Sequence, residues 1–142
     1  MEGRNIKIFI VEDDKYFNHL LTRYVGVICE NMQHNGSSFE IKSFPNAHQC
    51  IEEMGNGVDL MILDYYLDNF NEAEALTGED VISKAKTSCP ECKIIMVSSL
   101  KDRQKATELL NMGIYDYVDK NLSSSNRIGS LLQEAIREKT IN

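Results

Sequence analysis

Long hydrophobic runs are absent from the 142-residue sequence. The longest uninterrupted apolar stretches, such as residues 8–11 and 60–63, are far shorter than the roughly 20 residues that a membrane-spanning helix needs. Residues 1–5 lead directly into a strand-like segment, with neither the apolar stretch nor the small-residue cleavage site of a signal peptide. We therefore expect no membrane helix and a cytoplasmic protein.

Cysteine and basic residues are both scarce. The chain has four cysteines, and a chain of this length can build a core without disulfide bonds, so we expect reduced thiols. Its 15 Lys and Arg are outnumbered by 22 Asp and Glu, which gives a net charge of -7. Because such a surface repels phosphates and anionic lipids, we expect no nucleic-acid binding by this domain.

Short β-branched or aromatic segments alternate with segments of helical periodicity. The apolar residues, 42% of the chain, are enough for one hydrophobic core, so we expect one domain. The predicted strands are residues 6–11, 39–44, 60–63, 93–97 and 115–118, and each is followed by a predicted helix. This order predicts an α/β fold, (βα)5, with a parallel sheet covered by helices on both faces.

Local signals refine this arrangement. Asp14, Asn46 and Thr77 stand where helix N-caps are expected. The uninterrupted apolar run at residues 60–63 is typical of a central strand, whereas alternation at residues 39–44 indicates an edge strand.

Polar residues follow the predicted strands. Glu12 and Asp13 follow the first strand, Asp64 the third, Ser98 the fourth and Lys120 the fifth. The carboxyl ends of parallel strands lie at a common edge, where ligands usually bind. We therefore expect these five side chains to converge.

Three carboxylates in such a cluster repel one another. Two of them about 4 Å apart interact unfavourably by about 4 kcal/mol at an effective dielectric constant of about 20, and one lysine cannot offset three. A hard divalent cation such as Mg²⁺ can, because it prefers oxygen ligands and keeps part of its hydration shell. Mg²⁺ beside an open carboxylate, with lysine and hydroxyl donors, suits phosphoryl transfer.

Four motifs, in order, carry a resemblance to a known family: Val11-Glu12-Asp13-Asp14, Leu63-Asp64, Val97-Ser98-Ser99 and Tyr117-Val118-Asp119-Lys120. Over about residues 5–138 the chain resembles the receiver domain of two-component response regulators, the CheY-like superfamily. The resemblance implies a doubly wound sheet with the flavodoxin-like strand order 2-1-3-4-5. It also implies that residues 1–142 form a single receiver domain with no output domain.

The resemblance assigns roles to the site residues. Asp64 would be the phosphoacceptor, taking a phosphoryl group from a phosphohistidine of a sensor histidine kinase or histidine phosphotransfer protein. Lys120 and Ser98 would bind phosphoryl oxygens. Such a domain assists its own phosphorylation and dephosphorylation and is a signalling module, not an enzyme.

The resemblance also implies a metal site. Glu12, Asp13, Asp64 and the backbone carbonyl of Tyr66 would hold Mg²⁺, for which Mn²⁺ could substitute.

A switch follows from the same resemblance. Phosphorylation adds charge and three acceptor oxygens at Asp64, and Ser98 would move to meet one of them. Tyr117 would then turn inward. The face made by the fourth helix, fifth strand and fifth helix would bind a downstream protein or support a phosphorylation-dependent homodimer.

Two positions depart from the family pattern. Asp68 and Asn121 stand where family members usually have proline, and the loop from Asp64 to Gly78 is about six residues longer and acidic. A non-proline residue strongly favours a trans bond, so we expect one before Asn121.

Two other functions fit part of this pattern. One is a pseudo-receiver that docks partners without phosphorylation. The other is a haloacid dehalogenase type phosphohydrolase, which needs a second Asp two residues after the nucleophile, where this chain has Tyr66.

Cys89 and Cys92 have the spacing of a redox pair or half a zinc site. They follow a predicted helix and precede a strand, whereas a thioredoxin-type pair begins a helix. We interpret them as structural.

Overall fold

The computed structural model describes residues 4–33, 36–65, 76–99, 103–121 and 124–141. Ten elements alternate along these residues: β1 (Asn5–Val11), α1 (Lys15–Asn31), β2 (Ser38–Phe44), α2 (Ala47–Met54), β3 (Leu60–Asp64), α3 (Gly78–Ser88), β4 (Lys93–Ser98), α4 (Arg103–Asn111), β5 (Asp116–Asp119) and α5 (Ser124–Thr140). The five strands pair in the order β2-β1-β3-β4-β5, and all pairs are parallel. The (βα)5 prediction and the strand order implied by the resemblance are confirmed.

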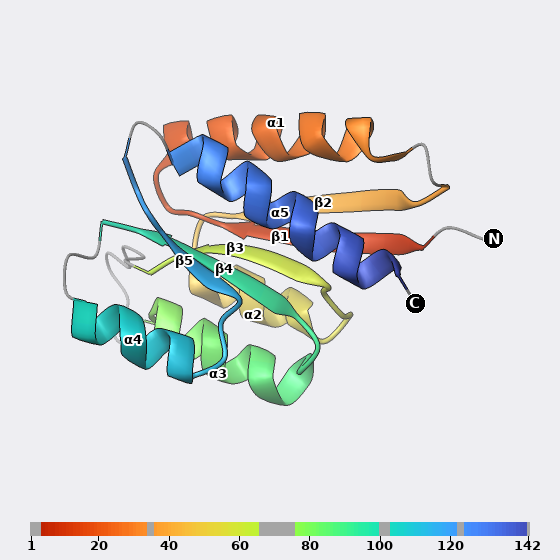
Figure 1. Cartoon of the computed structure of the whole chain (residues 1–142). Helices are drawn as coiled ribbons and strands as arrows, with labels where there is room; N and C mark the ends of the chain where they lie inside the picture. Colours follow the sequence, from red (N-terminus) through yellow and green to blue (C-terminus); the bar gives the residue numbers. More distant parts are fainter. Residues whose placement is uncertain (1–3, 34–35, 66–75, 100–102, 122–123, 142) are drawn as a thin grey trace.

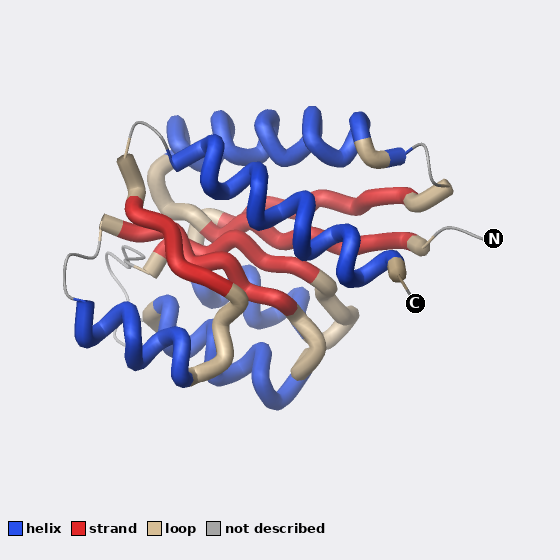
Figure 2. The backbone as a smooth tube through the Cα atoms, in the orientation of Figure 1, coloured by secondary structure: helices blue, strands red, loops and turns tan. Residues whose placement is uncertain are grey.

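Helices cover both faces of the sheet (Figures 1 and 2). One layer consists of α1 and α5, and the other of α2, α3 and α4. Side chains of β1 alternate between the two layers: Ile8 and Ile10 join the core under α1 and α5, whereas Phe9 and Val11 join the core under the other helices. Every residue of β3 is buried, as predicted for the central strand, and the more exposed β2 forms an edge.

The predicted caps start three helices. Asp14 accepts hydrogen bonds from the amides of Tyr16 (2.9 Å) and Phe17 (3.3 Å), and Asn46 accepts one from the amide of Gln49 (2.9 Å). Thr77 forms a reciprocal capping box with Asp80 at the start of α3. The cap at Asp14 fixes where the chain turns from β1 into α1, and so places the residues between them.

Element bounds differ slightly from the prediction. β5 begins and ends one residue later than the apolar run at residues 115–118 indicates, so Lys120 follows the strand directly. Strand pairing, which extends to Asp119 opposite Ser98, sets this end.

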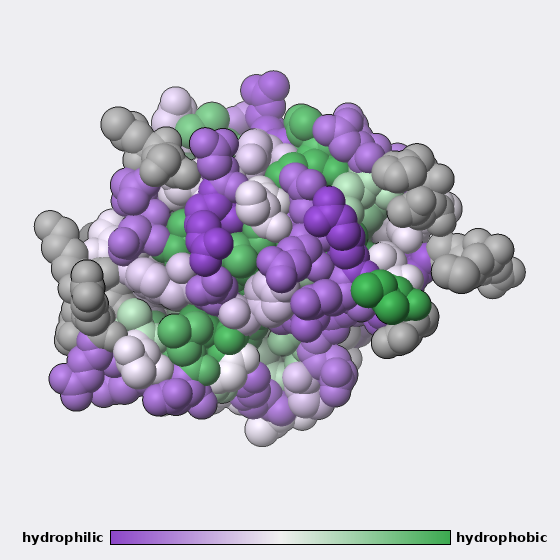
Figure 3. Space-filling view, viewed as in Figure 1, coloured by the Kyte–Doolittle hydropathy of each residue, from purple (hydrophilic) through white to green (hydrophobic). Residues whose placement is uncertain are grey.

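No helix in the described ranges is long and apolar enough to span a bilayer. Viewed over α4, β5 and α5, the surface is mostly hydrophilic, with hydrophobic side chains in small groups (Figure 3).

Candidate functional site

Strand register brings the predicted site residues to one edge of the sheet. Val11 pairs with Leu63, so Glu12 and Asp64 extend from neighbouring strands. Asp64 pairs with Val97, one residue before Ser98, and Ser98 pairs with Asp119, one residue before Lys120. Residues far apart in sequence therefore meet because three parallel pairings end together.

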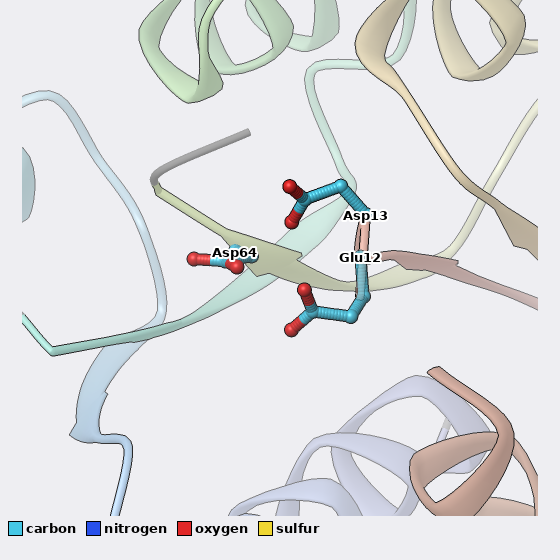
Figure 4. Close-up of side chains that lie close together, drawn as sticks. All are labelled: Glu12, Asp13 and Asp64. Carbon is cyan, nitrogen blue, oxygen red and sulfur yellow. The ribbon is translucent and has the colours of Figure 1, made fainter. Parts of the chain in front are cut away.

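The three acidic side chains form one cluster (Figure 4). One carboxylate oxygen each from Glu12, Asp13 and Asp64 lies within 4.8 Å of the others. Only 2% of Glu12 and 6% of Asp64 is exposed, whereas Asp13 is half-buried at the mouth of the cluster. Three converging oxygen donors with one side open to solvent match the ligand chemistry of a hard divalent cation.

Lys120 reaches into this cluster from the end of β5. Its Nζ donates hydrogen bonds to Glu12 Oε1 at 2.7 Å and to Asp64 Oδ2 at 3.4 Å, and it lies 4.3 Å from the centroid of the Phe17 ring. None of the peptide bonds in the described ranges is cis, so the bond before Asn121 is trans, as expected. Lys120 reaches the acidic cluster with this trans bond.

Burial and charge have opposite effects on the pKa values of Glu12 and Lys120 in the metal-free site. Burial raises the pKa of Glu12 to about 8, although the hydrogen bond from Lys120 acts to lower it. Burial acts to lower the pKa of Lys120, but the hydrogen bond to Glu12 and the negative charge of Asp64 outweigh it and raise that pKa. Lys120 therefore remains an ammonium group.

Ser98 places a hydroxyl beside the cluster. Its side chain is fully buried, and its Oγ has no hydrogen-bond partner among the described residues. The backbone around it is held, because its carbonyl accepts from the Lys120 amide at 2.9 Å. A buried hydroxyl without a partner costs roughly 1–3 kcal/mol, so the site has an unused donor available for a ligand oxygen.

Tyr117 lies on β5 beside Ser98. Its hydroxyl lies 2.7 Å from Asp119 Oδ1 and 3.2 Å from the Ser98 carbonyl oxygen, and the side chain is half-buried. The Tyr117 hydroxyl therefore links β5 to the backbone at the end of β4.

The family model of the response regulator receiver domain matches residues 8–132. The chain belongs to this family. A comparison with curated proteins finds no match.

Solved structures show the same fold at low sequence identity. A response regulator receiver domain protein from Clostridium thermocellum is 17% identical with a TM-score of 0.71, covering 94% of this chain and 96% of that one. A CheY-like receiver domain protein from Methanospirillum hungatei is 21% identical with a TM-score of 0.67, covering 94% and 96%. A CheX-CheY-BeF3-Mg²⁺ complex from Borrelia burgdorferi is 16% identical with a TM-score of 0.71, covering 92% and 89%.

Two contacts of this receiver domain were not anticipated from its sequence. The Tyr65 hydroxyl donates to Glu79 Oε1 at 3.0 Å, and Lys105 of α4 forms an ion pair with the same carboxylate. Lys105 Nζ also lies 5.8 Å from the centroid of the Tyr65 ring. The residue after Asp64 is thus linked to the starts of α3 and α4. The Glu79 carboxylate thus has two partners.

Gly78 allows a close backbone approach that no local sequence pattern indicates. A Cβ at this position would lie 2.9 Å from the Tyr65 carbonyl oxygen and 3.3 Å from that of Asp64. Any larger residue would therefore displace the backbone that carries Asp64. Its only signal in the sequence was a glycine beside the Thr77 cap.

Some predicted residues lie outside the described ranges. These are Tyr66, whose carbonyl the resemblance places among the metal ligands, and Asp68, Glu72 and Glu74 of the acidic loop.

Proposed function

We propose that this receiver domain is the phosphoacceptor of a two-component or phosphorelay system, with Asp64 as the residue that is phosphorylated. The observation that supports this most strongly is the combination of the acidic cluster, the Lys120 ammonium and the partnerless Ser98 hydroxyl around Asp64. Each is a group that phosphoryl transfer needs.

Asp64 would act as the nucleophile. Its carboxylate is nearly buried at the end of β3, where the rigid sheet fixes its position. A carboxylate oxygen attacks the phosphorus of a phosphohistidine, the P–N bond breaks, and its electron pair stays on the imidazole nitrogen. The product is an aspartyl phosphate.

Lys120 would stabilise the charge that develops on the phosphoryl oxygens. Its Nζ is 3.4 Å from Asp64 Oδ2, so it needs little movement to reach an oxygen on a phosphoryl group attached there. The Phe17 ring and Glu12 hold the ammonium in this position.

Glu12, Asp13 and Asp64 would hold Mg²⁺. Their oxygen donors and the open side at Asp13 fit a cation that retains waters. With Mg²⁺ held by these residues, the site would gain positive charge beside the phosphoryl oxygens.

Ser98 and Tyr117 would convert phosphorylation into a change of surface. A phosphoryl oxygen offers the Ser98 hydroxyl the partner that it lacks, and Ser98 would move toward it. The Tyr117 hydroxyl lies 3.2 Å from the Ser98 carbonyl, so movement of this backbone disturbs a contact of Tyr117. Because Ser98 would contact the phosphoryl group in only one arrangement of the site, phosphorylation would shift the population toward that arrangement.

The affected surface is that of α4, β5 and α5, which faces the viewer in Figure 1. Leu110 and Met112, at the end of α4, are 43% and 37% exposed and offer apolar contacts there. We propose this surface for a downstream protein or a second copy of the domain. A histidine kinase or histidine phosphotransfer protein would approach the open side of the acidic cluster.

A docking module that is never phosphorylated remains the rival. In such a module the partnerless Ser98 hydroxyl and the cluster of three carboxylates would each cost stability and serve no function. Incubation with Mg²⁺ and acetyl phosphate, followed by intact-mass measurement, separates the two. We expect a gain of one phosphoryl group that is absent in Asp64→Asn and in a chelator control; no gain in the wild type would favour the docking module.

A further inference from the structure

The turn between α3 and β4 brings two cysteines together. In Cys89-Pro90-Glu91-Cys92, the amide of Cys92 donates to the carbonyl of Cys89 at 2.9 Å. Such a turn holds its first and last Cα atoms within about 7 Å, and a disulfide needs a Cα separation of about 4.4–6.8 Å. The backbone therefore already spans the distance that a bridge would need.

The two cysteines are neighbours in this turn but differ in accessibility. Cys92 acts to lower the pKa of the Cys89 thiol, and the Cys92 Sγ lies 3.9 Å from the Lys93 carbonyl oxygen. Cys89 is half-buried at the C-cap of α3, whereas only 6% of Cys92 is exposed. A reagent in solution can reach Cys89, and Cys92 is placed behind it as the second thiol.

Their surroundings favour a thiolate on Cys89. The hydrogen bond from Cys92 lowers the pKa of Cys89 to about 7, against burial and the charge of Asp59. The same hydrogen bond and burial raise the pKa of Cys92. Lys139 of α5, whose Nζ donates to the Glu91 carbonyl in the same turn, adds a positive charge that favours both thiolates.

A metal site does not explain this pair. Cys50 of α2 is close enough to interact electrostatically with both thiols, and its burial raises its own pKa to about 12. However, within the described ranges the acidic cluster at Asp64 is the only group of three or more candidate ligand atoms lying within 4.8 Å of one another.

We propose that Cys89 and Cys92 form a reversible intramolecular disulfide by exchange with a low-molecular-weight disulfide such as oxidised glutathione. The Cys89 thiolate attacks one sulfur of that disulfide; the S–S bond breaks, and the first thiolate leaves and takes up a proton. Cys92 loses its proton to solvent and attacks the Cys89 sulfur, which expels the second thiolate. The two protein thiols are oxidised by two electrons, and the small disulfide is reduced to two thiols.

This site is separate from the proposed phosphorylation site. The turn leads into the start of β4, whereas Asp64 is the last residue of β3, so the two sites lie at opposite ends of these parallel strands (Figure 1). The proposal differs from the structural interpretation made from sequence, which relied on the place of the pair after a helix. At that place no helix N-terminus stabilises a Cys89 thiolate, but Cys92 and the positive charge of Lys139 both act to lower the pKa of Cys89.

The experiment titrates the folded full chain with a series of reduced and oxidised glutathione buffers. The protein is then denatured in N-ethylmaleimide, which blocks every free thiol, and intact mass and peptide mass are measured. We expect the wild type to lose two alkylatable thiols in one step, with the link mapped to Cys89 and Cys92. The control variant Cys29→Ser, at a buried cysteine in α1, should behave identically.

Single variants separate the attacking thiol, Cys89, from the second thiol, Cys92. Cys92→Ser should retain glutathione as a mixed disulfide on Cys89, and Cys89→Ser should take up none, because the remaining thiols are buried. If Cys92→Ser does not fold, Cys92→Ala and the wild-type peptide map decide the question. Four alkylatable thiols in the wild type under full oxidation, a bridge from Cys50, or stoichiometric zinc on these cysteines would overturn the proposal.

Discussion

Lys120 donates a 2.7 Å hydrogen bond to Glu12 across 108 residues of sequence. The contact joins the ends of β5 and β1, and it places the positive charge of the site on a residue that is also a candidate metal ligand. In the proposed function, Lys120 would therefore compete with a bound cation for Glu12 and would also stabilise the phosphoryl group.

Removing this lysine should separate these two effects. In Lys120→Gln the acidic cluster loses its compensating charge, so we expect Mg²⁺ affinity to rise several-fold, measured by calorimetry. Phosphorylation by acetyl phosphate should fall at least tenfold, because no ammonium stabilises the phosphoryl oxygens. Lys42→Gln, whose partner is Glu53 at a surface site, is the control. An unchanged Mg²⁺ affinity would show that Lys120 does not compensate the cluster.

Glu12 should make stability depend on pH in the metal-free protein. Its pKa is about 8 when folded and 4.5 ordinarily, so between these values the folded state retains a proton that the unfolded state releases. Stability contributed by the protonated form is complete below pH 4.5 and is lost as pH rises toward 8. A glutamine has no such loss. The advantage of Glu12→Gln in thermal melts with chelator should therefore grow with pH.

The control for this titration is Glu40→Gln, at an exposed residue of β2. A stability difference between Glu12→Gln and the wild type that stays constant from pH 4.5 to 8 would contradict the raised pKa.

Gly78 should act as a positioning residue. Its missing side chain lets α3 start against the backbone of Asp64 and Tyr65. Gly78→Ala should cost about 1–3 kcal/mol in denaturant unfolding and also weaken Mg²⁺ binding, since the clash falls on the strand end that carries Asp64. At Gly55, after α2, an added Cβ meets nothing within 4 Å, so Gly55→Ala should leave both quantities nearly unchanged. Equal behaviour of the two variants would refute this role.

Ser98→Ala should separate stability from signalling. Removing a buried hydroxyl without a partner should leave the unphosphorylated variant as stable as the wild type, or slightly more stable. The change at Tyr117 on phosphorylation, followed by NMR, should be lost. The adjacent Ser99 is exposed, and Ser99→Ala should keep the change. Retention of the Tyr117 response in Ser98→Ala would exclude Ser98 from the switch.

Much of the fold was predictable because its signals are local. Apolar runs, helical spacing and the caps at Asp14, Asn46 and Thr77 each act over a few residues, and they agree with one another. The meeting of Glu12, Asp64 and Lys120 was also predictable, since each directly follows or ends a strand of a parallel sheet.

Other contacts depend on tertiary packing that no local pattern encodes. The link of Tyr65 to Glu79 and Lys105, the Phe17 ring beside Lys120, and the close approach at Gly78 all join separate elements. The thiol pair also depends on such packing: its spacing is visible in the sequence, but the contribution of Lys139 comes from α5.

The position of the phosphoryl group tests the central claim most directly. The protein phosphorylated with acetyl phosphate and Mg²⁺ is treated with borohydride, which reduces an aspartyl phosphate to homoserine, and its peptides are sequenced by mass spectrometry. We predict homoserine at position 64, with Glu12 and Asp13 unchanged. Reduction at any other residue, or an unmodified Asp64 in protein that carries the added mass, would contradict the account.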